Sequence, residues 1–268
     1  MEITITKITN HKRYKQRYHL FIDKGNGEEY GFSVDEDVLI KKGIRKGLKI
    51  THAELEKIID EDEMKKTYHL AIHYLSYRIR SIEEMRKYLN EKGRMVKHIE
   101  LVIKKLIEEH LLDDQDFAER YLSTKKNTQL KGPNKVKQEL VQKGVNSSII
   151  DQALLNYSFS EQVEKVKNWL EKQKHSPRES LQATKTKWFQ RLLTKGFSQE
   201  VINEAFSLHE FNGEHHLEEN ALYYQAEKLK KKYSLKYNNF EYEQKMKQAL
   251  YRKGFSLELI QSYLEQDK

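Results

Sequence analysis

The sequence contains no cysteine, which excludes disulfides, thiolate metal sites and cysteine nucleophiles. Only two prolines occur in 268 residues, as is typical of a mostly helical chain. No run of uncharged apolar residues approaches the length of a membrane span, so we expect a soluble protein. The start, residues 1–4, lacks a basic segment followed by an apolar one, so we expect a cytoplasmic protein without a signal peptide.

Signatures of catalysis are also missing. No phosphate-binding loop, nucleophile elbow or dinucleotide fingerprint occurs. His69 and His73 have the i, i+4 spacing of zinc ligands, but no Glu follows His69 and no Cys completes the set. The acidic run at residues 113–116 suits a helix N-terminus better than a magnesium site. We therefore expect no enzyme, no metal and no cofactor.

What the chain does contain is a fourfold repeat. Leu, two residues, Lys, Gly and, six residues after the Gly, Ile recur with glycines 51, 52 and 58 residues apart, at Gly93, Gly144, Gly196 and Gly254. A period of this size indicates a repeat architecture. The leucine-to-glycine element reads as a helix C-cap, in which the glycine takes a left-handed conformation and the lysine favours the negative end of the helix.

Basic charge has the same period. The chain carries +8 overall, whereas residues 77–98, 125–143, 172–195 and 228–253 carry +4, +5, +6 and +7. The rest of the chain is therefore net acidic. Each window alone is typical of a solvated helix face. In stacked repeats, however, four windows in phase would line up as a cationic stripe that attracts phosphate backbones irrespective of sequence.

The first part of the chain differs from the rest. Residues 1–34 alternate as three strands, with a hairpin turn at residues 25–27, and acids at 35–37 favour a helix start. Each later repeat reads as three helices. We predict a mainly α fold with an N-terminal β-strand and helix region and four three-helix repeats, with these bounds: 1–62, 63–115, 116–158, 159–211 and 212–268.

Caps can be predicted for many of these helices. Ser81 and Glu84 form a capping box, and Ser176-Pro177 and Gly132-Pro133 place proline at the first position of the second helix of their repeats. Polar residues after three of the repeat glycines favour caps of the third helices: Asn146, Ser198 and Ser256.

Helix, glycine turn and helix also describe a sequence-specific DNA reader. The third helices argue against that role, because they are neutral to acidic and carry no basic residue in 197–210 or 255–266. Several aromatic residues near the basic windows could stack on unpaired bases, although most fit the apolar face of a helix better: Tyr77, Tyr88, Trp188, Phe189, Tyr233 and Tyr237.

Four short motifs, in order, resemble the RecX family, the regulatory proteins of the RecA recombinase. They occupy residues 74–81 (Tyr-Leu-Ser-Tyr-Arg-Ile-Arg-Ser), 89–93, 112–121 (Leu-Asp-Asp-x-x-Phe-Ala-x-x-Tyr) and 132–145. The resemblance covers about residues 65–265. It implies repeats stacked into an elongated, curved body that lodges in the groove of the RecA filament on single-stranded DNA and modulates recombination, usually negatively. The third and fourth repeats keep the Lys-Gly framework but lack the Asp-Asp-x-x-Phe-Ala motif.

The function we predict is that of a monomeric regulator without catalytic activity, with the RecA filament and single-stranded DNA as partners and no membrane. Two alternatives stay open: a stand-alone single-strand DNA binder and a helical scaffold for acidic proteins. The candidate contacts to the filament or to DNA come from the four basic windows: Arg78, Arg80, Arg86, Lys87, Lys125, Lys126, Lys131, Lys135, Lys137, Lys185, Lys187, Arg191, Lys230, Lys231 and Lys232.

Overall fold

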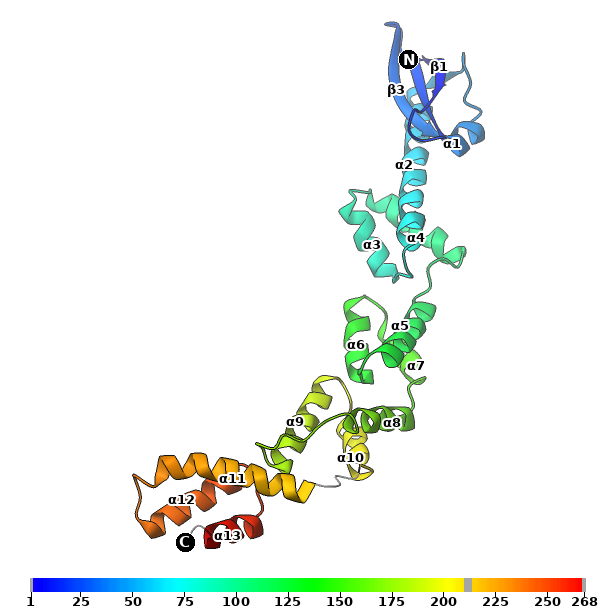
Figure 1. The fold of residues 1–268 in the computed structure, drawn as a ribbon. Coiled ribbons are helices and arrows are strands. Elements are labelled where there is room, and N and C mark those ends of the chain that lie inside the picture. The colour runs from blue at the N-terminus through cyan, green and yellow to red at the C-terminus, as the bar shows by residue number, and fades with distance from the viewer. Residues whose placement is uncertain (1, 210–213, 267–268) are drawn as a thin grey trace. The chain divides into compact units, whose positions relative to one another are not determined.

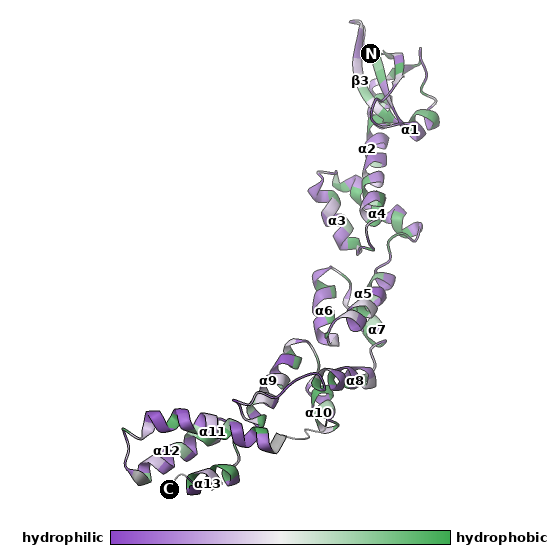
Figure 2. Cartoon of the chain, viewed as in Figure 1, coloured by the Kyte–Doolittle hydropathy of each residue, from purple (hydrophilic) through white to green (hydrophobic). Residues whose placement is uncertain are grey.

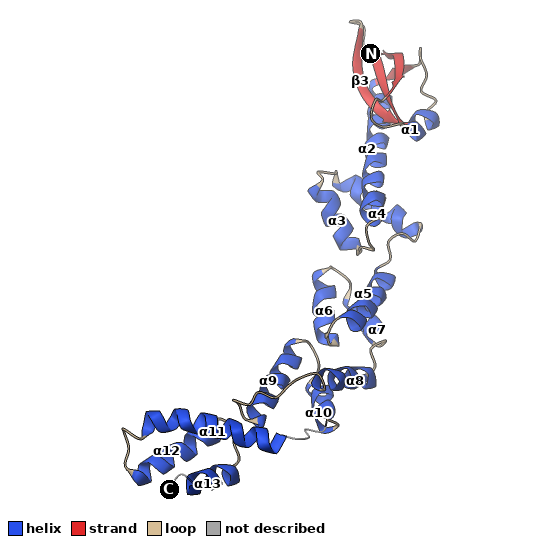
Figure 3. Ribbon diagram, in the orientation of Figure 1, coloured by secondary structure: helices blue, strands red, loops and turns tan. Residues whose placement is uncertain are grey.

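The structure is a computed structural model that describes residues 2–209 and 214–266. Within these residues the chain forms a small antiparallel sheet followed by twelve of its thirteen helices, the first helix lying inside the sheet region (Figures 1 and 3). The contacts divide the chain into two compact units. The first comprises Met1–Phe117 and Lys143–Asn146, and the second comprises Ala118–Gln142 and Ser147–Lys268.

The three predicted strands are present: β1 (Glu2–Asn10), β2 (Arg17–Asp23) and β3 (Glu28–Asp35). A fourth strand, β4 (Lys49–Thr51), was not predicted because its three residues are too short to show an alternation. The sheet is antiparallel in the order β3-β2-β1-β4. The acids after β3 start α1 (Glu36–Lys41) as predicted, with the Asp35 carboxylate accepting from the Asp37 amide.

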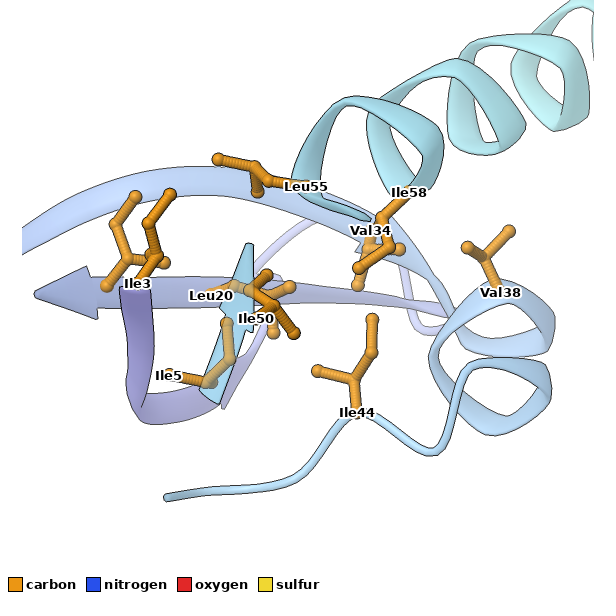
Figure 4. Close-up of a cluster of buried hydrophobic side chains, with 10 residues drawn as sticks. Ile3, Ile5, Leu20, Val34, Val38, Ile44, Ile50, Leu55 and Ile58 are labelled. Carbon is orange, nitrogen blue, oxygen red and sulfur yellow. The ribbon is translucent and has the colours of Figure 1, made fainter. Parts of the chain in front are cut away.

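One face of the sheet carries the core of the N-terminal lobe. Leu20 and Ile22 of β2 and Ile3 and Ile5 of β1 are buried there, together with side chains from α1, β4 and the next helix. That helix is α2 (His52–Leu75), which begins at a capping box made by Thr51 and Glu54. Figure 4 shows its Leu55 and Ile58 side chains in this cluster.

α2 is shared by the lobe and the first repeat. Its first turns bury Leu55 and Ile58 against the sheet, and its last turns bury Ala71 in the first repeat. The helix is continuous for 24 residues, so the predicted boundary after residue 62 lies inside it.

The repeats contain three helices each. The first repeat adds α3 (Ile82–Glu91) and α4 (Val96–Glu108) to α2. The others are listed in chain order: α5 (Asp114–Thr128), α6 (Pro133–Gln142) and α7 (Ser147–Leu154); α8 (Phe159–Leu170), α9 (Leu181–Thr194) and α10 (Gln199–Ser207); α11 (Glu214–Tyr233), α12 (Asn239–Arg252) and α13 (Leu257–Gln266).

The helices contain polar as well as apolar residues. Figure 2 shows hydrophilic and hydrophobic residues mixed along every helix. In the part of the chain that the structure describes, no helix is both long enough and apolar enough to cross a membrane.

Most predicted caps are confirmed. The Ser81–Glu84 capping box is present, Pro133 is the first residue of α6, and Ser198 caps α10. The predicted cap at Ser176 is wrong, because α9 begins at Leu181 and its cap is Ser180. Proline suits both a helix start and a turn, and here Ser176 to Glu179 form a turn closed by a backbone hydrogen bond of 3.2 Å.

The repeat glycines have positive φ angles, as a left-handed C-cap requires: 69° at Gly93, 77° at Gly144, 90° at Gly196 and 90° at Gly254. Three of them have a second role, which was not predicted. They lie against the start of the second helix of an earlier repeat.

In the second unit, the start of α6 receives the end of α9. The Gly132 amide donates to the Lys195 carbonyl over 2.8 Å, and the Asn134 amide donates to the Gly196 carbonyl over 3.1 Å. A Cβ on Gly132 would lie 2.3 Å from the Gly196 oxygen, so only glycine permits this approach. Free amides at a helix start thus satisfy free carbonyls at a helix end.

The other two contacts use a serine instead of a glycine. In the second unit, Ser180 donates its hydroxyl to the Lys253 carbonyl and accepts from the Ala183 amide. In the first unit, Ser81 donates to the Lys143 carbonyl and accepts from the Glu84 amide. One hydroxyl therefore caps its own helix and holds the end of another. We call these three contacts the Lys-Gly junctions.

Candidate nucleic-acid interface

The cations of the first repeat are held by their neighbours. Arg78 makes two hydrogen bonds of 3.0 Å to Glu84, and Arg86 makes ion pairs of 2.8 Å with Glu83 and with Glu100. Hydrogen bonds to Glu100 and Glu83 raise the pKa of Arg86. The positive charges of both arginines are therefore already partly balanced by neighbouring carboxylates.

Arg80 lies over an aromatic ring instead. Its guanidinium is 3.8 Å from the centre of the Tyr74 ring, which in turn stacks on Tyr88 at 3.8 Å. The Lys92 ammonium is 5.5 Å from the centre of the Tyr88 ring. The motif at residues 74–81 thus builds a stack that fixes Arg80 in place.

Glu84 lies at the centre of the junction in the first unit. It accepts from Arg78 and, over 2.6 Å, from the Lys143 ammonium. Burial disfavours its charge, but the hydrogen bonds from Arg78 and Lys143 outweigh burial and lower the pKa of Glu84 to about 2. Lys143 was not among the predicted site residues, and its partner lies too far away in sequence for a pattern to show it.

The cations of the second repeat are also held by neighbouring side chains. Lys126 pairs with Glu161 over 2.8 Å, and Lys137 pairs with Asp151. Lys131 pairs with Glu139, and although burial opposes it, this contact lowers the pKa of the Glu139 carboxyl. Lys125 lies 5.1 Å from the centre of the Tyr121 ring.

In the third repeat, Lys187 bonds to Glu179 over 2.6 Å and Arg191 lies 5.4 Å from the Trp169 ring. Lys185 lines a cavity of about 580 Å³, together with Glu218, Glu219 and Glu258. In the fourth repeat, Lys230 is half-buried, Lys231 is exposed and Lys232 lies 5.6 Å from the Tyr233 ring.

Only some predicted cations are therefore available to a phosphate without rearrangement. Within residues 2–209 and 214–266, Lys87, Lys135 and Lys231 form no ion pair, and Lys87 and Lys231 are exposed. At least six of the predicted cations form ion pairs and would have to exchange a carboxylate for a phosphate: Arg78, Arg86, Lys126, Lys131, Lys137 and Lys187.

Most of the aromatic residues near the basic windows pack inside the repeats, as predicted. Tyr88 packs against the first repeat's cluster, Trp188 and Phe189 against the third, and Tyr233 against the fourth. Tyr77 differs, since it is 70% exposed.

The acidic run at residues 113–116 caps α5, as predicted. Asp113 accepts from the Gln115 amide over 2.7 Å and from the Asp116 amide over 3.3 Å. Burial raises the pKa of Asp114, which accepts from the Ile82 amide. Among the described residues, no group of three or more His, Asp or Glu side chains could hold a metal ion.

One basic cluster was missed by the sequence reading. Lys12, Arg13 and Lys15 lie between β1 and β2, and Arg17 is the first residue of β2; all four are outside the four windows. The sequence does show four cations in six residues. This cluster does not recur in the repeats, and it lies in the part of the chain that is net acidic as a whole, so it was not predicted as a site.

Comparison with known families agrees with this architecture. A model of the RecX N-terminal domain matches residues 3–51, and models of the first and second RecX three-helix domains match residues 68–106 and 113–154. The model of the third three-helix domain matches twice, at residues 160–206 and 218–264. The chain belongs to the RecX family.

Full-length relatives support the assignment. A RecX regulatory protein of Halalkalibacterium halodurans is 49% identical over 97% of this chain and 98% of its own length. One from a Geobacillus strain is 44% identical over 98% and 97%. A RecX crystal structure matches with a TM-score of 0.61 and 32% identity, covering 76% of this chain and 99% of that one. RecX from Lactobacillus salivarius matches with a TM-score of 0.52 and 35% identity, covering 55% and 96%.

Proposed function

We propose that this protein regulates the RecA recombinase, mostly negatively, by binding in the groove of the RecA filament on single-stranded DNA. Membership of a family of regulatory proteins supports the role, and the name RecX points to RecA as the partner. On this proposal the protein acts as a cytoplasmic monomer in homologous recombination and the SOS response, without a cofactor or catalytic activity.

The observation that carries the proposal is the recurrence of the Lys-Gly junction. The same helix start receives the same helix end three times, at Ser81, Gly132 and Ser180. A basic window ends at or near each of these lysines. A recurring junction therefore repeats the basic flank along the chain, which suits a partner that is itself a repeating filament.

The alternation of acidic and basic helices suggests which helices contact RecA and which contact DNA. Helices α10 and α13 carry exposed acids and no basic residue, at Glu200 and Glu204 and at Glu258 and Glu265. We propose that these third helices face basic surface on RecA and that the cations of the second helices face the DNA phosphates.

Charge-reversal variants of Lys131, Lys135 and Lys137 test the assignment of the DNA-facing cations. Reversing the three charges should weaken inhibition of RecA filament activity. Because Lys131 and Lys137 are bound to Glu139 and Asp151, we also specify neutralisation to Gln, which leaves no like-charge pair beside those acids. Unchanged inhibition at physiological salt would refute the assignment of these lysines.

A matched control exists in the N-terminal lobe. Lys41 and Lys49 are ion-paired with Glu61 and Glu2, and Lys46 is exposed without such a pair among the described residues. The Gln triple variant at Lys41, Lys46 and Lys49 removes the same charge and the same number of ion pairs. It should inhibit as well as the wild type.

One series of DNA-binding measurements distinguishes the proposed regulator from the two alternative functions. Affinity for single-stranded DNA is measured with and without RecA over a range of salt concentrations. A regulator acts on coated DNA at concentrations where naked DNA is bound weakly, a stand-alone DNA binder shows a steep salt dependence without RecA, and a scaffold binds neither.

A further inference from the structure

The sheet of the N-terminal lobe has an outer face that its own core does not cover. Tyr18, Leu20 and Ile22 point to the core, so the alternation of the strand directs His19 and Phe21 to the opposite face. Irregularities in the pairing at Ile5/Lys7 and at Leu20/Phe21 shift the register. They bring Lys7 and Tyr30 opposite Phe21 on this outer face.

Aromatic rings on this face form a continuous series, which we call the outer aromatic row: Tyr14, His11, His19, Tyr30 and Phe21. Its ring centres are 5.0 Å apart for Tyr14 and His11, 4.6 Å for His11 and His19, 5.5 Å for His19 and Tyr30, and 5.9 Å for Tyr30 and Phe21. The two tyrosines are largely exposed, Tyr14 at 59% and Tyr30 at 55%. Rings that fill no core of their own chain are unusual at this density.

Cations flank the row. The Lys7 ammonium lies 5.3 Å from the Phe21 ring, and the loop after β1 carries Lys12, Arg13 and Lys15, all exposed. Within residues 2–209 and 214–266, these three loop cations form no ion pair. They differ in this respect from the ion-paired candidate cations of the repeats, such as Arg86 and Lys126.

The loop that carries these cations is tightly folded. The His11 Nδ1 atom accepts from the amides of Arg13 and Tyr14, and the Arg17 amide donates to the Tyr14 carbonyl over 3.1 Å. Burial, then His19 and nearby arginines, lowers the pKa of His11, which keeps this nitrogen free to accept at neutral pH. The loop therefore presents its cations from a defined conformation.

A cavity of about 740 Å³ adjoins the loop on the side of α2. It is lined by Arg13, Tyr14 and Lys15 of the loop and by Arg94, whose Nη1 atom bonds to Glu63 over 3.0 Å while its Nε atom is buried and has no hydrogen-bond partner. Arg17 and Lys66 also line it, but both are bound to Asp62. A phosphate in this cavity would meet Arg13 and Lys15 of the loop, which form no ion pair among the described residues.

We propose that the outer face of the N-terminal sheet is a second binding site for single-stranded nucleic acid, in which bases stack on the outer aromatic row and phosphates meet Lys7, Arg13 and Lys15. The site goes beyond the proposed function, because it uses none of the repeat cations that the proposed function assigns to the filament or to DNA. Alternating rings and cations match the alternating bases and phosphates of an unpaired strand. An acidic peptide would use the cations but leave the rings without a partner.

The experiment measures binding of a short fluorescent oligo(dT) to the full chain by anisotropy over a salt series. Tyr14→Ala with Tyr30→Ala should weaken binding about tenfold or more without changing the salt dependence, since stacking involves no counterions. Arg13→Ala with Lys15→Ala should weaken binding and reduce the slope against log salt by about 1.4, because each phosphate contact to a single strand contributes about 0.7.

Two controls remove similar side chains elsewhere. Arg45 and Lys46 are exposed in the loop between α1 and β4, and Arg45→Ala with Lys46→Ala removes the same charge from the same lobe. Tyr251 of α12 is 60% exposed, and Tyr251→Ala removes an exposed ring. Both controls should bind oligo(dT) as the wild type does.

A localisation experiment on the unmodified protein does not depend on the folding of any variant. Oligonucleotides containing 5-iodouracil should crosslink on irradiation to peptides that contain Tyr14 or Tyr30. Wild-type binding by the tyrosine variant, equal affinity for duplex of the same length, or crosslinks confined to the repeats would overturn the proposal. So would displacement of oligo(dT) by polyglutamate that depends on Arg13 and Lys15 but not on the tyrosines. The proposed regulatory function is measured as inhibition of RecA. The regulatory function and the nucleic-acid site on the N-terminal sheet can therefore be refuted independently.

Discussion

Gly93 and Gly196 end equivalent helices, yet their surroundings differ. Both have positive φ angles, 69° and 90°. A Cβ on Gly93 would meet no atom within 4 Å, whereas one on Gly196 would lie 2.3 Å from the Lys135 nitrogen and 2.6 Å from its Cβ. The same sequence element is thus a simple helix end in the first repeat and part of a Lys-Gly junction in the third.

The difference separates a local requirement from a tertiary one. Any glycine C-cap needs a left-handed conformation, whatever lies around it. Only a junction glycine must also lack a side chain, because the start of another helix occupies that space. Gly144 and Gly254 behave like Gly196, with a Cβ reaching 2.4 Å from Glu83 and 2.8 Å from the Ser180 hydroxyl.

The largest effect is expected from alanine at Gly196. Gly196→Ala combines the backbone cost with a clash against backbone atoms, and should lower the free energy of unfolding by about 3 kcal/mol or more. Gly93→Ala carries only the backbone cost, about 1–2 kcal/mol. Urea denaturation of both variants measures the difference, and equal losses would contradict the distinction.

A smaller effect is expected from the junction serine. Ser180→Ala removes both the cap of α9 and the hydrogen bond to the Lys253 carbonyl, so we expect a loss of about 2 kcal/mol. Ser256, an exposed residue that accepts from the Leu259 amide, provides the control for capping alone. Ser256→Ala should cost about 1 kcal/mol, and a loss as large as that of Ser180→Ala would show that the second bond contributes little.

The smallest effect concerns Glu84 and depends on pH. Its pKa in the folded protein is about 2, below its ordinary value of 4.5, so its contribution is present above pH 4.5 and is lost as pH falls toward 2. Glu84→Gln should therefore lower stability near pH 6 by about 1 kcal/mol, and the difference from wild type should shrink between pH 4.5 and 2. Denaturation curves at several pH values test this, and a difference that stays constant would argue against the ionised Glu84.

The elements that were predicted correctly are those with strong local signals. The three long strands alternate, and the Ser81 box and the repeat glycines mark helix ends within a few residues. The short β4 has no alternation, and it pairs with β1 over residues Glu2 to Thr4. Ser176 carried a misleading signal, because a serine before a proline starts turns as well as helices.

The candidate site was harder to predict than the fold. The positions of the cations are visible in the sequence, but their partners lie far along the chain, as with Lys126 and Glu161 or Lys143 and Glu84. The outer aromatic row joins residues of a loop and two strands through the register of the sheet. No linear pattern contains such contacts.

Residue spacing along the chain and backbone preferences that act over one helical turn were enough to predict the repeat, the helix ends at the repeat glycines and the family. Three-dimensional packing was needed to show which glycines lie against another helix, which cations are ion-paired and which aromatic rings are exposed. Those properties depend on distances between residues that are remote in sequence, and packing alone brings such residues together.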